Sequence, residues 1–208
     1  MQVNSSVKNI IFDLGVVLLN IDYSLTQKAF RQLGITDFDA LYSQLHQDKI
    51  FDDFEKGLIS AAEFRNTLRK ISDKNWSDAQ IDAAWNAMLL DFPEKRLQLL
   101  EKLKSRYRLS LLSNTNEIHI NYFSNYLQKT FGIADLSNVF EKEYFSYEIK
   151  MRKPDTEIYE YVLREKKILA QETLFIDDLL INVKAAETIG LQTIHLASPN
   201  TILDIIFI

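Results

Sequence analysis

The segment Lys8-Asn9-Ile10-Ile11-Phe12-Asp13-Leu14-Gly15-Val16-Val17-Leu18-Leu19-Asn20 is an apolar run that contains a single acidic residue. Its first part is typical of a strand buried on both faces, as at the centre of a parallel sheet. A carboxylate inside such a run costs free energy unless another group pairs with it or binds it. Asp13 therefore needs a partner from elsewhere in the chain.

The composition narrows the classes of function. The chain has 208 residues, 47% of them hydrophobic and 25% charged, which suits one large domain or one domain with an insertion. The formal net charge of −5 disfavours nucleic acid as a partner. The absence of cysteine excludes disulfides and thiolate sites, and it suits a reducing compartment. No cleavable signal is visible and no apolar run could span a bilayer, so we expect a cytoplasmic protein without a membrane partner, either a monomer or a homodimer.

The pattern of secondary structure changes near Pro93. Residues 21–90 carry helical patterns almost without interruption, with Ser60 and Ser77 as expected N-caps and a further helix expected over residues 38–46. After Pro93, helices alternate with short strands, which predicts a parallel sheet with helices on both faces. We therefore expect an α/β fold with a Rossmann-like core formed by residues 1–20 and 91–208, and an all-helical insertion at residues 21–90.

Polar residues follow four of the predicted strands. In a parallel sheet with right-handed crossovers the carboxyl ends of the strands share one edge, where such sheets bind ligands. The residues expected there are Asp13, Ser113, Asn114, Lys153, Asp177 and Asp178. Each site alone is explained more simply as a turn or a helix cap. Four of them, each after its own strand, favour one shared site.

The chemistry expected of this site is phosphoryl transfer. Carboxylates at close range cannot all stay ionised without a counter-charge, and Mg²⁺ with oxygen ligands supplies one. Lys153 adds positive charge, while Ser113 and Asn114 precede a helix N-terminus, which attracts anions. A carboxylate nucleophile beside a cation and an anion-binding turn indicates an aspartyl-phosphate intermediate on Asp13.

The same stretches resemble the four motifs of the haloacid dehalogenase-like hydrolase superfamily. They are Ile10-Ile11-Phe12-Asp13-Leu14-Gly15, Leu111-Leu112-Ser113-Asn114, Arg152-Lys153-Pro154 and Phe175-Ile176-Asp177-Asp178, and the resemblance extends from about Val7 to Leu196. The helical block resembles the small cap domain of one subgroup. Within that subgroup the motifs are similar to those of sugar-phosphate phosphatases, including those that act on α-D-glucose 1-phosphate.

The resemblance implies a role for each matching residue. Asp13 is the nucleophile and, with the backbone carbonyl of Gly15, a Mg²⁺ ligand. Asp178 binds the metal directly, and Asp177 binds it directly or through water. The phosphoryl group is held by Ser113 and the backbone of Asn114, and Lys153 offsets the charge of the phosphate and of Asp13. The substrate is then a small phosphorylated metabolite such as a sugar phosphate.

Two positions depart from the superfamily pattern. Most phosphatases of the superfamily carry a second Asp two residues after the nucleophile, which protonates the leaving group, and here that residue is Gly15. General acid–base help is worth about 10²–10⁴-fold in rate, so a good leaving group or a substitute such as Asp22 is needed. Val16 stands where relatives usually carry Asn or Gly, and its branched side chain stiffens the turn.

Two rival functions remain open. A dehalogenase uses the same Asp nucleophile without the second Asp, but it needs no metal and does not keep the acidic pair Asp177-Asp178. A non-catalytic binding protein would explain Gly15, but not the retention of Asp13 and Lys153. In the cap, Glu55 is the expected contact with the sugar, while Phe51 and Phe54 are expected in the cap core.

Overall fold

The structure is a computed structural model that describes residues 1–35 and 49–207. The helix expected over residues 38–46 lies outside the described residues. In order along the chain, the strands are β1 (Asn9–Phe12), β2 (Arg108–Ser113), β3 (Lys142–Phe145), β4 (Thr173–Asp177) and β5 (Gln192–His195). The α-helices are α1 (Tyr23–Gln32), α3 (Lys49–Glu55), α4 (Ala61–Ser72), α5 (Asp78–Asn86), α6 (Glu94–Leu103), α7 (Glu117–Phe131), α8 (Ser146–Ile149), α9 (Thr156–Lys166) and α10 (Leu180–Thr188).

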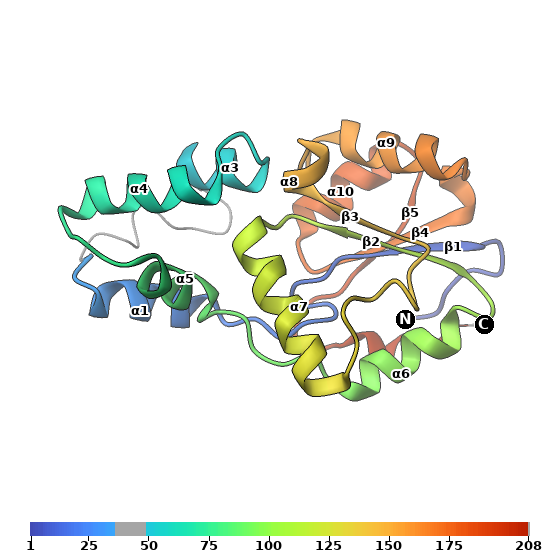
Figure 1. The fold of residues 1–208 in the computed structure, drawn as a ribbon. Helices are drawn as coiled ribbons and strands as arrows, with labels where there is room; N and C mark the ends of the chain where they lie inside the picture. The colour runs from blue at the N-terminus through green and yellow to red at the C-terminus, as the bar shows by residue number, and fades with distance from the viewer. Residues whose placement is uncertain (36–48, 208) are drawn as a thin grey trace.

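The five strands form one parallel sheet in the order β3-β2-β1-β4-β5. β1 is therefore the central strand, and the hydrogen bond from Asp13 N to Ile176 O (2.9 Å) carries its pairing with β4 one residue further. Helices cover both faces of the sheet, with α6 and α7 on one and α9 and α10 on the other (Figure 1). This is the Rossmann-like α/β core that the sequence predicts.

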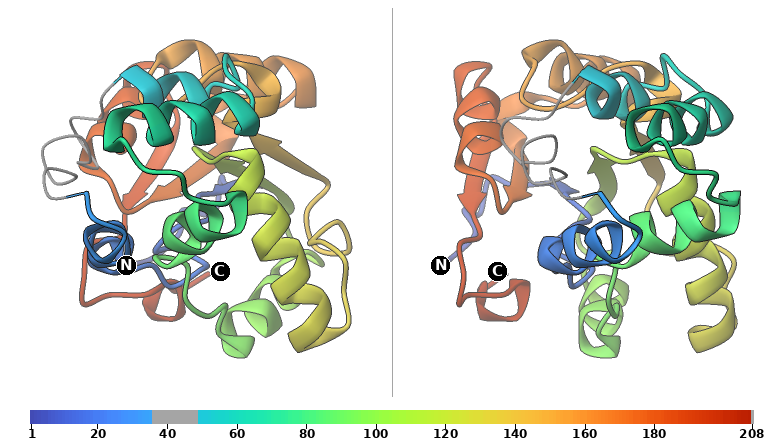
Figure 2. Two further views of the ribbon diagram at one scale, coloured as in Figure 1. Left: turned by 60° about the vertical axis from the view of Figure 1, so that its left-hand side comes forward. Right: turned by 90° about the vertical axis from the view of Figure 1, so that its left-hand side faces the viewer.

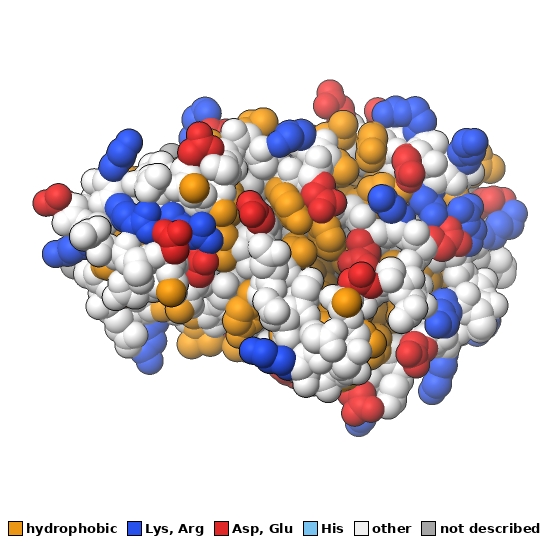
Figure 3. Space-filling view, viewed as in Figure 1, with side chains coloured by type: hydrophobic (Ala, Val, Ile, Leu, Met, Phe, Trp, Pro, Cys, Tyr) orange, Lys and Arg blue, Asp and Glu red, His pale blue; other side chains and the backbone are white. Residues whose placement is uncertain are grey.

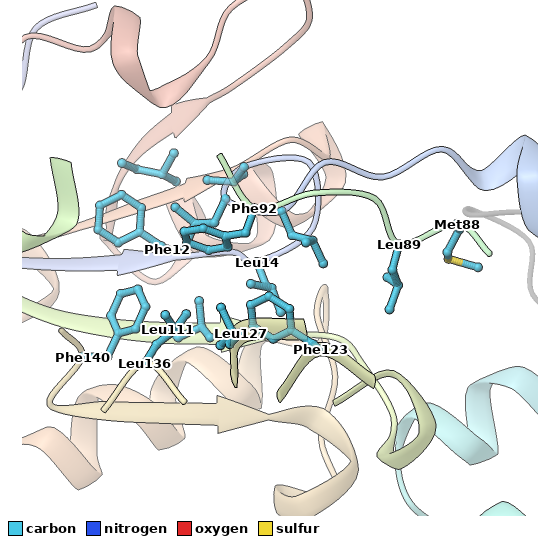
Figure 4. Close-up of a cluster of buried hydrophobic side chains, with 14 of the residues drawn as sticks. Phe12, Leu14, Met88, Leu89, Phe92, Leu111, Phe123, Leu127, Leu136 and Phe140 are labelled. Atoms are coloured by element: carbon cyan, nitrogen blue, oxygen red, sulfur yellow. The ribbon is translucent and has the colours of Figure 1, made fainter. Parts of the chain in front are cut away.

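Alternation along the central strand divides the core between the two faces. Ile10 and Phe12 belong to the larger hydrophobic cluster, and Ile11 to a smaller cluster with residues of α9 and α10. Figure 4 shows the larger cluster, in which Phe12 lies among side chains from β2 and α7. Met88 and Leu89 belong to the same cluster and lie on the segment that leads away from α5. All these side chains are buried, so β1 is fixed from both sides.

Helices α1, α3, α4 and α5 form a group beside the sheet (Figures 1 and 2). The two segments that join this group to the core run side by side. Asn20 N donates to Asp91 O (2.8 Å), and Leu90 N donates to Asn20 O (3.0 Å). Phe51 and Phe54 are buried within the group, as expected, where Phe51 stacks on Trp85 and Phe54 on Phe64. We propose that residues 21–90 are the cap domain.

The predicted caps form, and several element ends differ from the prediction. Ser60 and Ser77 each make a capping box at the start of α4 and α5. We expected α5 to continue to Leu90, but it ends at Asn86 because Leu90 instead pairs with Asn20. β3 starts at Lys142, although we expected a strand over residues 139–144, because Val139 N donates to Leu136 O in a turn. Within the described residues, no helix combines the length and hydropathy needed to cross a membrane.

Candidate active site

Asp13 follows the last residue of β1 at the carboxyl edge of the sheet. Its side chain is buried yet lines a pocket between the core and the cap helices. The loop behind it turns sharply, because Val16 has a left-handed φ of 60° and Val17 N donates to Gly15 O (2.5 Å). Such a φ is costly for a β-branched residue. The guanidinium of Arg96 donates to Leu18 O (3.0 Å) and helps to fix the loop.

Lys153 pairs with Asp13, although it lies 140 residues away in the chain. Its Nζ donates to Asp13 Oδ1 (2.6 Å), Asp177 Oδ2 (2.7 Å) and Leu112 O (2.9 Å). Burial opposes the charge on Lys153, but Asp13 and Asp177 outweigh that effect and raise its pKa above the ordinary range. The lysine is therefore a permanent cation between the two carboxylates.

Asp177 and Asp178 have different surroundings. Asp177 is fully buried, and its oxygens accept from Lys153, Leu179 N (2.8 Å) and Asn182 Nδ2 (3.0 Å). Asp178 lines the pocket beside Asp13. Burial raises the pKa of Asp13 to about 7. Lys153 lowers this pKa, whereas the charges of Asp177 and Asp178 raise it further. Burial and the charge of Asp177 raise the pKa of Asp178 to about 6.

This arrangement of carboxylates fits a divalent cation. Asp13, Asp177 and Asp178 each offer an oxygen, and these oxygens lie within 4.8 Å of one another. An octahedral Mg²⁺ with oxygens at about 2.1 Å spans a similar width. The raised pKa values show that negative charge is costly here, and a hard cation relieves that cost. The donor set is all oxygen, which suits Mg²⁺. Gly15 also lines the pocket beside Asp13.

Ser113 and Asn114 line the pocket at the end of β2. β2 lies on one side of β1, and β4, which leads to Asp178, lies on the other. The Asn114 amide makes a reciprocal pair with the backbone of Lys153, donating to Lys153 O (2.8 Å) and accepting from Lys153 N (2.9 Å). The amide thus positions the Lys153 loop. The structure therefore places Ser113, Asn114 and Lys153 around one part of the pocket, as the prediction of a phosphate site requires.

Glu55 reaches the same pocket from the cap. Its backbone carbonyl accepts from Ser146 Oγ (2.7 Å), and its carboxylate lies 3.1 Å from the guanidinium of Arg152. Arg152 also pairs with Asp52 and lines the pocket beside Lys153. An ion pair therefore joins cap helix α3 to the segment that carries Lys153. No role was predicted for Arg152, although it precedes Lys153 in the third motif.

His119 and Trp85 also line the pocket, and neither was predicted from the sequence. Their rings stack with centroids 5.1 Å apart and planes 3° apart. Asn116 Oδ1 accepts from His119 N (3.1 Å) and from Trp85 Nε1 (3.3 Å), so one amide holds both residues. The available signal for His119 was the spacing Asn116-x-x-His119. This spacing places His119 in the first turn of the helix that follows Ser113 and Asn114.

The space beside Gly15 is filled by Ile21. A Cβ atom placed on Gly15 would lie 2.8 Å from Ile21 Cδ1, closer than carbon atoms normally approach. Ile21 therefore takes part of the room that an acidic side chain at position 15 would use. Asp22 does not replace that acid, because it is exposed and its carboxylate caps α1 by accepting from Ser24 N (3.0 Å).

Apolar side chains form the rest of the pocket. They come from the first loop, from the end of the cap and from α7: Leu19, Ile21, Met88, Leu89, Ile120 and Phe123. Figure 3 shows hydrophobic side chains gathered in a band between the cap helices and the sheet domain. The polar end of the pocket thus lies at the edge of the sheet. The apolar wall lies opposite, between the sheet domain and the cap helices.

The chain is similar to known proteins over nearly its whole length. The profile of the haloacid dehalogenase-like hydrolase family matches residues 10–196. A D-ribitol-5-phosphate phosphatase from Bacteroides thetaiotaomicron is 30% identical over 187 residues, which cover 90% of each chain.

Solved structures with the same fold include enzymes of this family. A HAD (haloacid dehalogenase-like) family enzyme from Bacteroides thetaiotaomicron, crystallised as an aspartate-to-alanine variant with magnesium and inorganic phosphate, superposes with a TM-score of 0.88 at 40% identity. The match covers 93% of this chain and 96% of that one. A predicted HAD-like hydrolase from Porphyromonas gingivalis superposes with a TM-score of 0.84 at 29% identity, covering 91% of each chain.

Proposed function

The chain belongs to the haloacid dehalogenase-like hydrolase family, and we propose that it hydrolyses small phosphorylated polyols or sugars through an aspartyl-phosphate on Asp13. It is a hydrolase of phosphate esters and uses Mg²⁺, as its phosphatase relative and the magnesium–phosphate complexes of similar enzymes show. The nucleophile, the substrate class and the roles of the individual residues are the parts proposed here.

One observation supports the mechanism above all others. Asp13 lines the pocket, while Lys153 holds its Oδ1 at 2.6 Å. The ion pair favours the ionised carboxylate despite its burial. Asp13 Oδ2 is then available as the nucleophile, because carboxylates form covalent phosphoryl intermediates when positioned beside the phosphorus atom. No other acidic residue of the described chain combines this position with a buried lysine.

In the first step, an oxygen of Asp13 bonds to phosphorus and the ester oxygen leaves with its electron pair. In the second step, water attacks phosphorus and gives up a proton to solvent, and the bond between phosphorus and Asp13 breaks. Inorganic phosphate is released and the Asp13 carboxylate is regenerated. Ser113 and the backbone of Asn114 hold the phosphoryl oxygens, while Lys153 offsets their charge. Asp13, Asp178, the Gly15 carbonyl and Asp177, directly or through water, would hold Mg²⁺, which stabilises negative charge on the phosphoryl group when bound.

The leaving group takes its proton from solvent in this proposal. Gly15 has no side chain, and Ile21 fills the space beside it. Asp22 is used as a helix cap. The rate should therefore depend strongly on the leaving group, because neither Gly15 nor Asp22 offers an acid that could protonate it.

The rival functions fit the site less well. A dehalogenase would have no use for Asp178 beside Asp13, where the cluster of three carboxylates fits a cation instead. A binding protein that had lost turnover would not need the buried lysine between two carboxylates, which is costly to maintain. The named activity of the D-ribitol-5-phosphate phosphatase relative also favours a phosphatase.

Polar groups at the cap side of the pocket support this substrate class. Glu55 and Arg152 offer an acceptor and donors suited to hydroxyl groups. The relative that acts on D-ribitol 5-phosphate supports a polyol or sugar chain on the phosphate. The same pocket has an apolar wall that would cover the carbon backbone of such a molecule.

A screen of phosphate esters tests this proposal. We expect Mg²⁺-dependent phosphate release from p-nitrophenyl phosphate and from polyol or sugar phosphates, including D-ribitol 5-phosphate, and its loss on adding EDTA. Chloride release from 2-chloropropionate without metal would instead support a dehalogenase. A phosphorylated Asp13 that forms but does not turn over would support the binding protein.

A further inference from the structure

The geometry points to His119 as a binding residue for the substrate chain: we infer that its Nε2 accepts a hydrogen bond from a hydroxyl group of the leaving alcohol. The inference rests on the proposed phosphatase function and goes further by assigning a residue that selects hydroxylated substrates. His119 lines the pocket with Ser113, Asn114 and Lys153, so it faces the same ligand.

The hydrogen bond on the other ring nitrogen fixes the tautomer of His119. Nδ1 lies 2.9 Å from Oδ1 of Asn86, a buried residue at the end of α5. A carbonyl oxygen only accepts, so Nδ1 carries the hydrogen and Nε2 carries a lone pair. In the part of the chain that the structure describes, no group is recorded as a hydrogen-bond partner of Nε2.

The ring is held in this orientation. Trp85 stacks on one face, and Asn116 accepts from the backbone N–H of His119. Turning the imidazole over would lose its bond to Asn86. Burial lowers the pKa of His119 to about 3, so the ring is neutral across the physiological range. Nε2 is therefore a fixed acceptor rather than a proton donor.

A fixed acceptor discriminates between classes of substrate. A hydroxyl group can donate to Nε2, whereas a carbonyl or carboxylate oxygen would set lone pair against lone pair. A buried polar group that loses its partner is costly, so a substrate without the hydroxyl binds less well. His119 thus favours polyol and sugar phosphates over phosphate esters of keto or carboxylic acids.

Two isosteric variants test the inference. His119→Asn keeps an N–H near the place of Nδ1 and has nothing at the place of Nε2, whereas His119→Gln puts its amide near the place of Nε2. We would measure kcat/KM for p-nitrophenyl phosphate, for D-ribitol 5-phosphate and for its monodeoxy analogues. In the wild type, at least one missing hydroxyl should cost about tenfold or more, as expected for one lost hydrogen bond.

The discrimination should vanish in His119→Asn and be largely kept in His119→Gln. Equal discrimination in the wild type and in His119→Asn would overturn the inference, as would an equal rate on all analogues in the wild type. If the wild type hydrolyses p-nitrophenyl phosphate but no hydroxylated ester, the inference fails while the phosphatase function stands. If it hydrolyses neither, the proposed function itself fails.

A measurement on the unmodified protein keeps the test independent of folding. The ¹⁵N NMR resonance of the unprotonated Nε2 should shift when free ribitol is added together with Mg²⁺ and inorganic phosphate. Mg²⁺ and phosphate alone, as the control, should leave it in place. An Nε2 resonance that ribitol does not move, or one typical of a protonated nitrogen, would contradict the assignment.

Discussion

Nζ of Lys153 lies 2.6 Å from Oδ1 of Asp13, and both side chains are buried. The second contact of the same ammonium, 2.7 Å to Asp177 Oδ2, joins the first and fourth motifs through one cation. Asn114 fixes the lysine backbone, so four segments far apart in the chain converge on this contact. We therefore expect Lys153 to contribute both to stability and to activity.

Replacing Lys153 with Met should reduce both stability and activity. The change leaves buried carboxylates without their cation, and breaking a buried ion pair costs about 3–5 kcal/mol. Loss of one charge-stabilising group in an active site costs about 10²–10³-fold in kcat. Urea unfolding and phosphate release measure the two effects. Lys184→Met is the matched control, because the exposed pair Lys184–Glu187 contributes little and should change the stability by about 0.5 kcal/mol or less.

Gly15→Asp should fail to supply the missing acid unless Ile21 is also shortened. A Cβ at position 15 would lie 2.8 Å from Ile21 Cδ1, so the end of the Ile21 side chain must move in the single variant. In Gly15→Asp/Ile21→Ala the carboxyl has room, and the dependence of kcat/KM on the pKa of the leaving group should become shallower. Ile21→Ala alone is the control for the cavity. If Gly15→Asp alone flattened the dependence as much as the pair, Ile21 would not be what excludes the acid.

Acidification should have opposing effects on stability, because the raised pKa values of Asp13 and Asp178 favour the folded protein as the pH falls. The stabilising contribution of His119, in contrast, should decrease below pH 6.5. The unfolded chain protonates this residue near its ordinary pKa of 6.5, while burial lowers the folded pKa to about 3. The unfolded state thus binds more protons at this residue between these values, and its contribution is lost on acidification by at most about 1.4 kcal/mol per pH unit. Urea unfolding of the wild type and of His119→Asn at pH 7 and 5.5 measures the free energy of unfolding. The difference between the two proteins gives the contribution of His119. The same pH dependence of the unfolding free energy in both proteins would show that His119 makes no such contribution.

Much of the architecture could be predicted from the sequence because it depends on local patterns. The apolar run before Asp13 and the strand–helix alternation after Pro93 predicted the parallel sheet, and capping boxes marked the starts of α4 and α5. Strand ends also predicted which polar groups share one edge, since parallel strands bring their carboxyl ends together.

The missed features depend on contacts between segments far apart in the chain. Trp85 and His119 meet only because α5 of the cap packs against α7 of the core, and no local pattern records that contact. Ile21 beside Gly15 is likewise a matter of side-chain packing. The predicted end of α5 was wrong because Leu90 pairs with Asn20, seventy residues earlier in the chain. Tertiary contacts thus end α5 earlier than helical propensity alone predicts.

Phosphate release by Asp13→Asn with Mg²⁺ and p-nitrophenyl phosphate tests the central claim most directly. The amide nearly keeps the shape of the side chain but cannot form the phosphoryl bond, so activity should fall by at least about 10⁴-fold, as for other enzymes that lose their nucleophile. Thermal unfolding would verify that the variant is folded. A folded Asp13→Asn protein that releases phosphate at the wild-type rate would contradict the proposal that Asp13 is the nucleophile.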